Sequence, residues 1–204
     1  MISRPDRRTQ SADWPDCSLG VDSVSGMPIP PHIAELRSLI GHRLLIVPTA
    51  RAVVIDDDRQ VVLGRDRDCD YPRWMFPGGV IDPAEHPADA AVRECFEETG
   101  IVAIPEALTS VTASPVITHK TGDLTQHIDI TFRCRAVGGD ARPYDGEFAE
   151  VRWYPFDDLP DMDPYDMSIL RLAIERRDSA AFTFSGLTDV LGLRDDDSHR
   201  AGTY

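Results

Sequence analysis

Positive charge is scarce in this sequence: 21 lysines and arginines face 35 aspartates and glutamates, so the 204 residues carry a formal net charge of −14. Proteins that grip nucleic acid or an anionic membrane surface normally show the opposite balance. We therefore expect neither nucleic acid nor a membrane as a partner. An anionic ligand would need local positive charge, from a metal ion or from a few placed arginine and lysine side chains.

Long apolar runs are also missing. Runs such as 44–47, Leu-Leu-Ile-Val, are far shorter than the roughly 20 residues that cross a bilayer. The first residues are polar and charged, and no apolar segment typical of a signal peptide follows them. On this basis we expect a protein of the cytoplasm that spans no membrane.

Cysteine pairs of the C-x-x-C type are absent, because the four cysteines lie far apart, at positions 17, 69, 95 and 134. This spacing argues against a zinc knuckle and against a dithiol redox motif. Cys95 and Cys134 lie within apolar patterns, where a reduced thiol packs as a small hydrophobic residue. The length and the 42% share of hydrophobic residues suit one globular domain with additional segments.

The chain is organised as one regular region between two less regular ends. Residues 1–29 are rich in Asp, Ser, Pro and Arg, so we expect a flexible lead there, and we expect a partly disordered tail over 179–204. Residues 30–178 form the predicted domain, whose patterns alternate between helical and strand-like and predict an α+β or α/β fold. Helices are expected at 31–40, 88–99 and 164–177, and strands at 44–47, 52–55, 60–64, 107–113, 127–136 and 149–154. The last helix is expected to place Met167, Leu170 and Ile174 on one face.

The most informative stretch contains three glutamates on one predicted helix. Glu94, Glu97 and Glu98 are spaced i, i+3, i+4 and therefore share one helix face. The three carboxylates repel one another, and Arg93 is the only nearby cation within that helix. Because hard divalent cations prefer oxygen ligands, the face is a candidate platform for Mg²⁺ or Mn²⁺. The simpler alternative is a solvated charged surface.

The surroundings of these glutamates resemble the Nudix box. Gly79, five residues, Glu85, seven residues and then the run 93–101 (Arg-Glu-Cys-Phe-Glu-Glu-Thr-Gly-Ile) match it position for position over 79–101. Cys95 is the one departure, because the family prefers Ile, Leu or Val there. The preceding run 74–79, with Trp74, Pro77 and two glycines, also resembles the segment that leads into the box. The resemblance to the whole domain covers about residues 48–177.

This resemblance implies a Nudix fold, an α+β arrangement in which a mixed sheet lies between helices (an α/β/α sandwich) and the box forms a loop–helix–loop. Members of the family hydrolyse a nucleoside diphosphate linked to another group, by attack of water on phosphorus with the help of divalent metal. The implied ligands of Mg²⁺ or Mn²⁺ are Glu97, Glu98 and the carbonyl of Gly78, while Glu94 would be a ligand or the general base. Arg93 would orient these carboxylates, and Glu85 and Gly79 would lie just outside the ligands.

Other site residues are expected on later or flanking segments. The family's site is often completed by an acid from a later loop. Glu147 is the preferred candidate, because it has the better spacing ahead of Trp153, and Glu150 is the second choice. The simpler alternative for either acid is a solvated loop residue. Lys120, in the polar loop 119–127, is a candidate contact for a substrate phosphate, and Trp74 is a candidate for stacking on a base. The simpler interpretations are an exposed lysine and a packed aromatic ring.

Three functions are compatible with the box. The first is a metal-dependent hydrolase that cleaves a phosphoanhydride bond in a nucleotide-type small molecule, with ADP-ribose or a nucleotide sugar, a nucleoside triphosphate and a dinucleotide polyphosphate all open as substrates. The second is a non-catalytic Nudix module that senses a ligand or binds a partner, but the complete box and the lack of a basic helix-turn-helix pattern favour the hydrolase. The third, an isomerase of isoprenoid diphosphates, would need a nucleophilic cysteine, for which Cys69 is the one to test. A homodimer is a further expectation.

Overall fold

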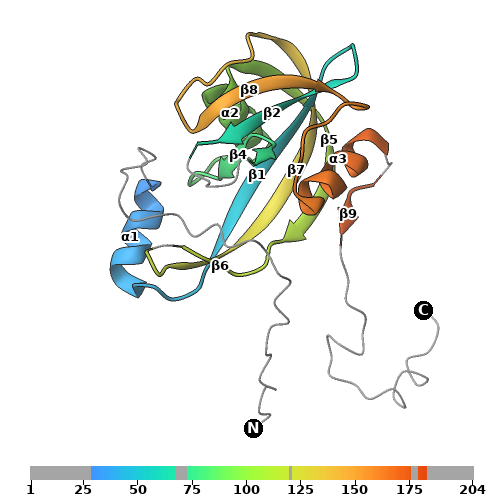
Figure 1. Ribbon diagram of the computed structural model, residues 1–204. Helices are drawn as coiled ribbons and strands as arrows, with labels where there is room; N and C mark the ends of the chain where they lie inside the picture. Colours follow the sequence, from blue (N-terminus) through green and yellow to red (C-terminus); the bar gives the residue numbers. More distant parts are fainter. Residues whose placement is uncertain (1–28, 68–72, 120, 176–178, 183–204) are drawn as a thin grey trace, which may run out of the picture.

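The computed structural model describes residues 29–67, 73–119, 121–175 and 179–182 (Figure 1). The predicted flexible lead, except Ile29, and the predicted tail beyond residue 182 lie outside the described residues, and so do Cys69 and Lys120. The predicted domain boundaries therefore stay predictions.

Among the described residues, nine strands form one mixed sheet with the order β3-β2-β1-β7-β5-β9, while β4 pairs with β1, β6 with β7 and β8 with β2. The central strands β1 and β7 run parallel, whereas β1 with β2 and β5 with β7 are antiparallel. The strands are β1 (Leu45–Ile55), β2 (Gln60–Asp66), β3 (Trp74–Met75), β4 (Gly78–Val80), β5 (Ile101–Ala113), β6 (Ile117–Thr118), β7 (Leu124–Gly139), β8 (Phe148–Pro155) and β9 (Ala181–Phe182). The helices are α1 (Pro31–Ile40), α2 (Pro87–Thr99) and α3 (Pro164–Glu175).

The central strand β1 supplies side chains to a core on each face of the sheet, because successive residues of a strand point to opposite sides. Ala50, Ala52 and Val54 pack in one buried cluster with residues of α2. Val53 and Ile55 pack in a second cluster with residues of α3. The sheet thus lies between α2 and α3, which confirms the predicted mixed sheet between helices and the α+β class (Figure 1).

Two sequence predictions about the strands are wrong in detail. Residues 44–47 and 52–55 were expected as two strands, but β1 is continuous through Pro48, because its pairing with β7 runs unbroken from Leu45 to Ile55. The proline carbonyl accepts a hydrogen bond from the Ile81 N–H at 3.2 Å. The strand expected at 107–113 begins at Ile101, because its first residues pair with the far end of β7.

The helix α3 packs Leu170 and Ile174 against the core as predicted, but not Met167. Its buried residues are Asp166, Ile169, Leu170 and Ala173, whereas Met167 is 37% exposed. A buried aspartate accounts for the difference, because hydrophobic spacing alone does not predict that an acid will face the sheet. The two interior cysteines are as expected: Cys95 and Cys134 are buried free thiols.

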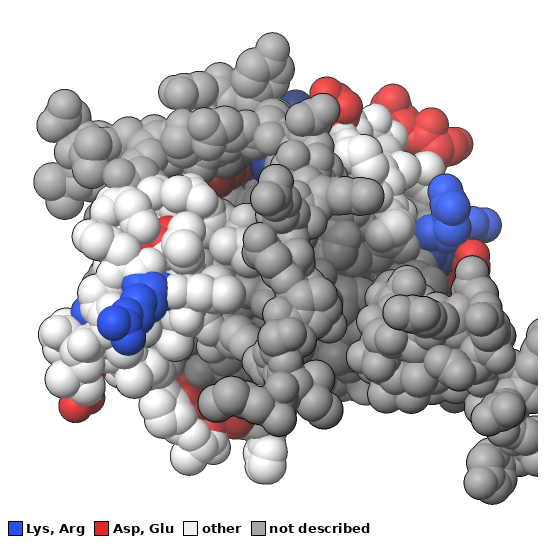
Figure 2. Space-filling view, turned by 90° about the horizontal axis from the view of Figure 1, so that it is seen from below, with Lys and Arg blue, Asp and Glu red and all other residues white. Residues whose placement is uncertain are grey.

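Several charged side chains on the described surface are paired. Examples are Arg37 with Asp123 and Arg65 with Glu150. On the face shown in Figure 2, the coloured basic side chains stand in separate groups rather than in a continuous stripe. None of the described helices has the length and hydropathy of a membrane span.

Candidate active site

The helix that carries the three glutamates has clear local boundaries. Pro87 occupies the first turn, where its missing N–H costs no hydrogen bond, and Gly100 ends the helix in the left-handed region at φ 70°. Ala90, Ala91 and Cys95 form the buried stripe. Cys95 therefore fills the small apolar position of the box, as expected for the one residue that departs from the family pattern.

Arg93 organises one side of the glutamate cluster. Its guanidinium donates to Glu85 at 2.8 Å, to Glu94 at 2.8 Å and to Glu97 at 3.0 Å. It also donates to the Val80 carbonyl at 3.1 Å, which ties the helix to the end of β4. The hydrogen bond from Arg93 holds the pKa of Glu85 below its ordinary value. These contacts are what an orienting role for Arg93, with Glu85 next to it, requires.

Glu94 lies directly over Gly79. A Cβ atom on that glycine would be 2.5 Å from the Glu94 Oε1, so only a residue without a side chain leaves room for the carboxylate. Burial raises the pKa of Glu94 to about 7, and the nearby Arg93 only partly opposes the rise. A carboxyl with this pKa can both hold and release a proton near neutral pH.

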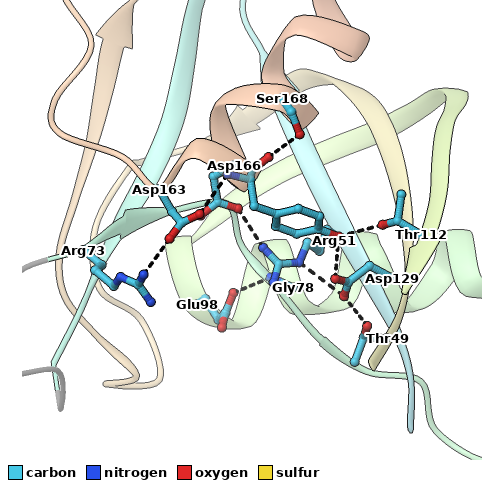
Figure 3. Close-up of polar contacts among 11 residues, drawn as sticks. Thr49, Arg51, Arg73, Gly78, Glu98, Thr112, Asp129, Asp163, Asp166 and Ser168 are labelled. Atoms are coloured by element: carbon cyan, nitrogen blue, oxygen red, sulfur yellow. Dashed lines mark hydrogen bonds and ion pairs between the residues drawn. The ribbon is translucent and has the colours of Figure 1, made fainter. Parts of the chain in front are cut away.

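Glu98 is the most deeply placed of the three acids, with 4% of its surface exposed. Its Oε2 accepts a hydrogen bond from the Gly78 N–H at 2.8 Å (Figure 3). Its side chain is also hydrogen-bonded to that of Glu147. Burial, reinforced by the Glu147 carboxyl, raises the pKa of Glu98 well above its ordinary value. The contact from Gly78 is made by its N–H, and the proposed role of its carbonyl stays a prediction.

Glu147, the preferred later acid, lies in the loop between β7 and β8 and reaches the helix. Its N–H donates to the Asp145 Oδ1 at 2.9 Å, and its carbonyl accepts from the Arg67 N–H at 3.3 Å. Burial also raises its pKa. The second choice, Glu150, is instead ion-paired with Arg65 and Arg152 on the strands of the sheet.

In the structure, the carboxylates of the glutamate cluster contact other groups of the protein. Within the part of the chain that the structure describes, no three His, Cys, Asp or Glu side chains are already arranged around a common metal position. The buried carboxyl of Glu98 and the half-buried one of Glu147 are in direct contact, and such a pair needs a shared proton or a cation. A donor set of carboxylate oxygens alone suits Mg²⁺ or Mn²⁺. The residues that could hold such an ion are Glu94, Glu98 and Glu147, with the half-exposed Glu97 at the rim.

A second charged cluster, on the α3 side of the sheet, was not predicted from the sequence (Figure 3). Arg51, which pairs with Gly78 across β1 and β4, donates to the Asp166 Oδ1 at 2.9 Å and lies 3.5 Å from the Asp129 Oδ1. Tyr165 donates to Asp129 at 2.8 Å. The one feature of the sequence that could have indicated this cluster is Arg51 itself, an arginine within a mostly apolar strand whose side chain faces α3.

The two carboxyls of this cluster differ in pKa. Burial raises the pKa of Asp166 to about 6 even though Arg51 opposes the shift. Burial acts in the same direction on Asp129, but there Arg51 and two hydroxyl groups outweigh it and hold the pKa below its ordinary value. The cluster fixes Arg51, and through it the strand beside Gly78.

Of the two candidate substrate contacts, only Trp74 belongs to the described residues. Trp74 is half-buried and packs edge-on against Tyr154, with 4.9 Å between ring centroids, as the simpler interpretation expected. Its stacking on a base therefore stays a prediction without a supporting contact. Lys120 lies outside the described residues.

Known proteins share both the sequence pattern and the fold. A family model of the NUDIX domain matches residues 46–173. A CMP-5'-(N-acetyl-N-hydroxy-3-aminopropyl)phosphonate hydrolase of Streptomyces rubellomurinus is 30% identical over 159 residues, which are 76% of this chain and 69% of that protein. A provisionally named 8-oxo-dGTP diphosphatase of Bacillus subtilis is 33% identical over 111 residues, which are 54% of this chain and 68% of that protein.

Solved structures agree on the fold. A UDP-X diphosphatase superposes with a TM-score of 0.53 at 19% identity, over 76% of this chain and 75% of the other. An ADP-ribose pyrophosphatase of Streptococcus suis gives a TM-score of 0.50 at 20% identity, over 67% of this chain and 96% of the other. At these identities the likeness concerns the fold alone. With the family model covering most of the chain, the chain belongs to the Nudix family and is a hydrolase of the pyrophosphate-bond class.

Proposed function

We propose that this hydrolase depends on Mg²⁺ or Mn²⁺ and cleaves a phosphoanhydride bond in a nucleoside diphosphate linked to another group. The observation that carries the proposal is the contact of the buried Glu98 with the half-buried Glu147, with Glu94 beside them over Gly79. These acids come from two segments, α2 and the loop before β8, and meet at one place. A cation there would offset the burial and, after it, the mutual repulsion that raise their pKa values.

The chain's own residues would divide the work as follows. Glu98, Glu147 and Glu97 bind the cation, and the Gly78 N–H fixes the Oε2 of Glu98. Arg93 holds Glu94 by its Oε1, which leaves the Oε2 to accept the proton of the attacking water. When bound, the divalent ion supplies positive charge that neutralises the diphosphate and polarises the water. Glu147 is the alternative proton acceptor.

The substrate class follows from the family and remains broad. Relatives named for a CMP-linked phosphonate and for an oxidised nucleoside triphosphate support a nucleotide-type small molecule. ADP-ribose or a nucleotide sugar, a nucleoside triphosphate and a dinucleotide polyphosphate are the candidates to compare. A homodimer and a cytoplasmic location stay predictions.

The test is a product-release screen of the full chain with Mg²⁺ and with Mn²⁺. The panel contains ADP-ribose, nucleotide sugars, canonical and 8-oxo nucleoside triphosphates, and diadenosine polyphosphates. Glu98→Gln is the blank, and Glu150→Gln is the matched control, because that acid is paired with arginines outside the cluster.

We expect one substrate to turn over with kcat/KM above about 10⁴ M⁻¹s⁻¹, unchanged in Glu150→Gln and lost in Glu98→Gln. Ligand-induced stabilisation without any hydrolysis across the panel would contradict the proposal and support a ligand-sensing module instead.

A further inference from the structure

The residues of the proposed site come from two segments, which must be held in a fixed position relative to each other. Glu94, Glu97 and Glu98 lie on α2, whereas Glu147 lies on the loop that follows β7. The contact between Glu98 and Glu147 therefore depends on how this loop is attached to the helix. The residues 140–147 are called the acid loop below.

The acid loop is attached to the last turn of α2 by backbone hydrogen bonds. The N–H groups of Arg142, Tyr144 and Asp145 donate to the carbonyls of Thr99, Glu98 and Glu97, at 3.0, 3.4 and 2.9 Å. The final carbonyls of a helix have no partner within it, so they are free to accept these donors. The same residues that carry two of the site's carboxylates thus bind the loop through their backbones.

Side chains reinforce this attachment at one point. The ring of Tyr144 packs on the ring of Phe96, with 5.1 Å between centroids. The Arg142 guanidinium lies over the Tyr144 ring, with its Cζ 5.5 Å from the ring centroid. Phe96 is the box residue between the glutamates, and it points away from the carboxylates toward the loop. Two aromatic rings in such contact stabilise each other beyond the effect of the area that they bury.

We propose that Tyr144 is a positioning residue, whose ring on Phe96 and N–H on the Glu98 carbonyl fix the acid loop to α2 and so hold the Glu147 carboxylate against that of Glu98. The inference rests on the proposed function for its consequence in catalysis. Tyr144 itself touches none of the carboxylates and is 52% exposed, so its loss removes the contact without opening the core.

The experiment compares Tyr144→Ala, Tyr144→Phe and Val137→Ala in the full chain. Val137 is a matched control, because it is 45% exposed on the neighbouring β7 and takes no part in the attachment. Mn²⁺ affinity is measured by electron paramagnetic resonance without substrate, and kcat and KM are measured on the substrate found in the screen. Amide exchange at 144 and 145 reports whether the loop has detached.

We expect Tyr144→Ala to weaken Mn²⁺ binding and to lower kcat by about tenfold each, as is typical when a residue behind a metal ligand is lost. KM should change less than about twofold, and Tyr144→Phe should restore both quantities, because its ring still packs on Phe96. Val137→Ala should match the wild type. Faster amide exchange in Tyr144→Ala together with wild-type Mn²⁺ affinity and kcat would overturn the inference.

Failure of the inference can be told apart from failure of the proposed function. If Glu147→Gln weakens Mn²⁺ binding but Tyr144→Ala does not, the positioning role is wrong and the metal site stands. If the wild type hydrolyses nothing in the panel, the proposed function is wrong, and Mn²⁺ affinity in the two tyrosine variants still decides the positioning role.

Discussion

Gly79→Ala separates the activity of the site from the stability of the fold. A Cβ atom at this position would lie 2.5 Å from the Glu94 Oε1 and 2.6 Å from its Cδ, whereas ordinary contacts begin at 3.4 Å. The carboxylate must therefore retreat by about 1 Å, which it can do at small cost because it is the far end of a flexible side chain. A displacement of about 1 Å of a reacting group can lower a rate by about a hundredfold.

The neighbouring Gly78 provides the matched contrast. A Cβ atom there would lie 2.4 Å from the backbone carbonyl oxygen of Ala50, which belongs to β1 and cannot move alone. Gly78→Ala should therefore lose about 1–3 kcal/mol of unfolding free energy, as overpacking does. Gly79→Ala should stay within about 1 kcal/mol of the wild type while kcat falls about a hundredfold.

Urea unfolding and steady-state kinetics on the two variants decide the point. If Gly79→Ala kept wild-type kcat, Glu94 would have no part in the chemistry. If Gly79→Ala were as unstable as Gly78→Ala, the added Cβ atom would not be meeting a side chain that can move aside, and this explanation would be wrong.

Three further predictions concern the later acid, the second charged cluster and the cation. Glu147→Gln should lower kcat by a few orders of magnitude, as severely as Glu98→Gln, while Glu150→Gln stays near wild type. A Glu147→Gln variant as active as Glu150→Gln in steady-state assays would make Glu147 an ordinary loop acid. Because the folded pKa of Asp166 is about 6, above its ordinary 3.8, the folded state binds the proton more tightly, and the unfolding free energy should fall by about 2 kcal/mol as pH rises from 4 to 7. Asp166→Asn should lack this part of the pH dependence in urea titrations, and an unchanged profile would contradict the raised pKa. Saturating Mn²⁺ should raise the unfolding free energy of the wild type by about 2.7 kcal/mol at a hundredfold excess over its Kd, and chelation should reverse the rise; an equal rise in Glu98→Gln would place the ion elsewhere.

The box helix could be predicted from sequence because its determinants are local. Proline at the start, glycine at the end and the spacing of three glutamates define α2 within one residue of the expected range. Helical spacing also brings Glu97 into contact with Arg93, since residues four apart are neighbours on a helix. The choice of Glu147 over Glu150 also rested on spacing, counted back from Trp153.

The parts that were missed depend on contacts between distant segments. The cluster of Arg51, Asp129 and Asp166 exists because β1 and β7 pair in one register and α3 then covers them. No local pattern marks an aspartate that will face a sheet, and so Met167 was assigned to the buried face of α3 instead. The attachment of the acid loop to α2 has the same origin, since backbone hydrogen bonds leave no trace in residue type.

The central claim is that the glutamates of α2 and the acid loop direct water to a phosphorus atom of a diphosphate. Hydrolysis in ¹⁸O-labelled water, with the products analysed by mass spectrometry, tests this most directly. The account predicts one ¹⁸O atom in the phosphate group of one product, with Mg²⁺ or Mn²⁺ present, and no product from Glu98→Gln. Label carried by carbon instead of phosphorus, or full product formation in Glu98→Gln, would contradict it.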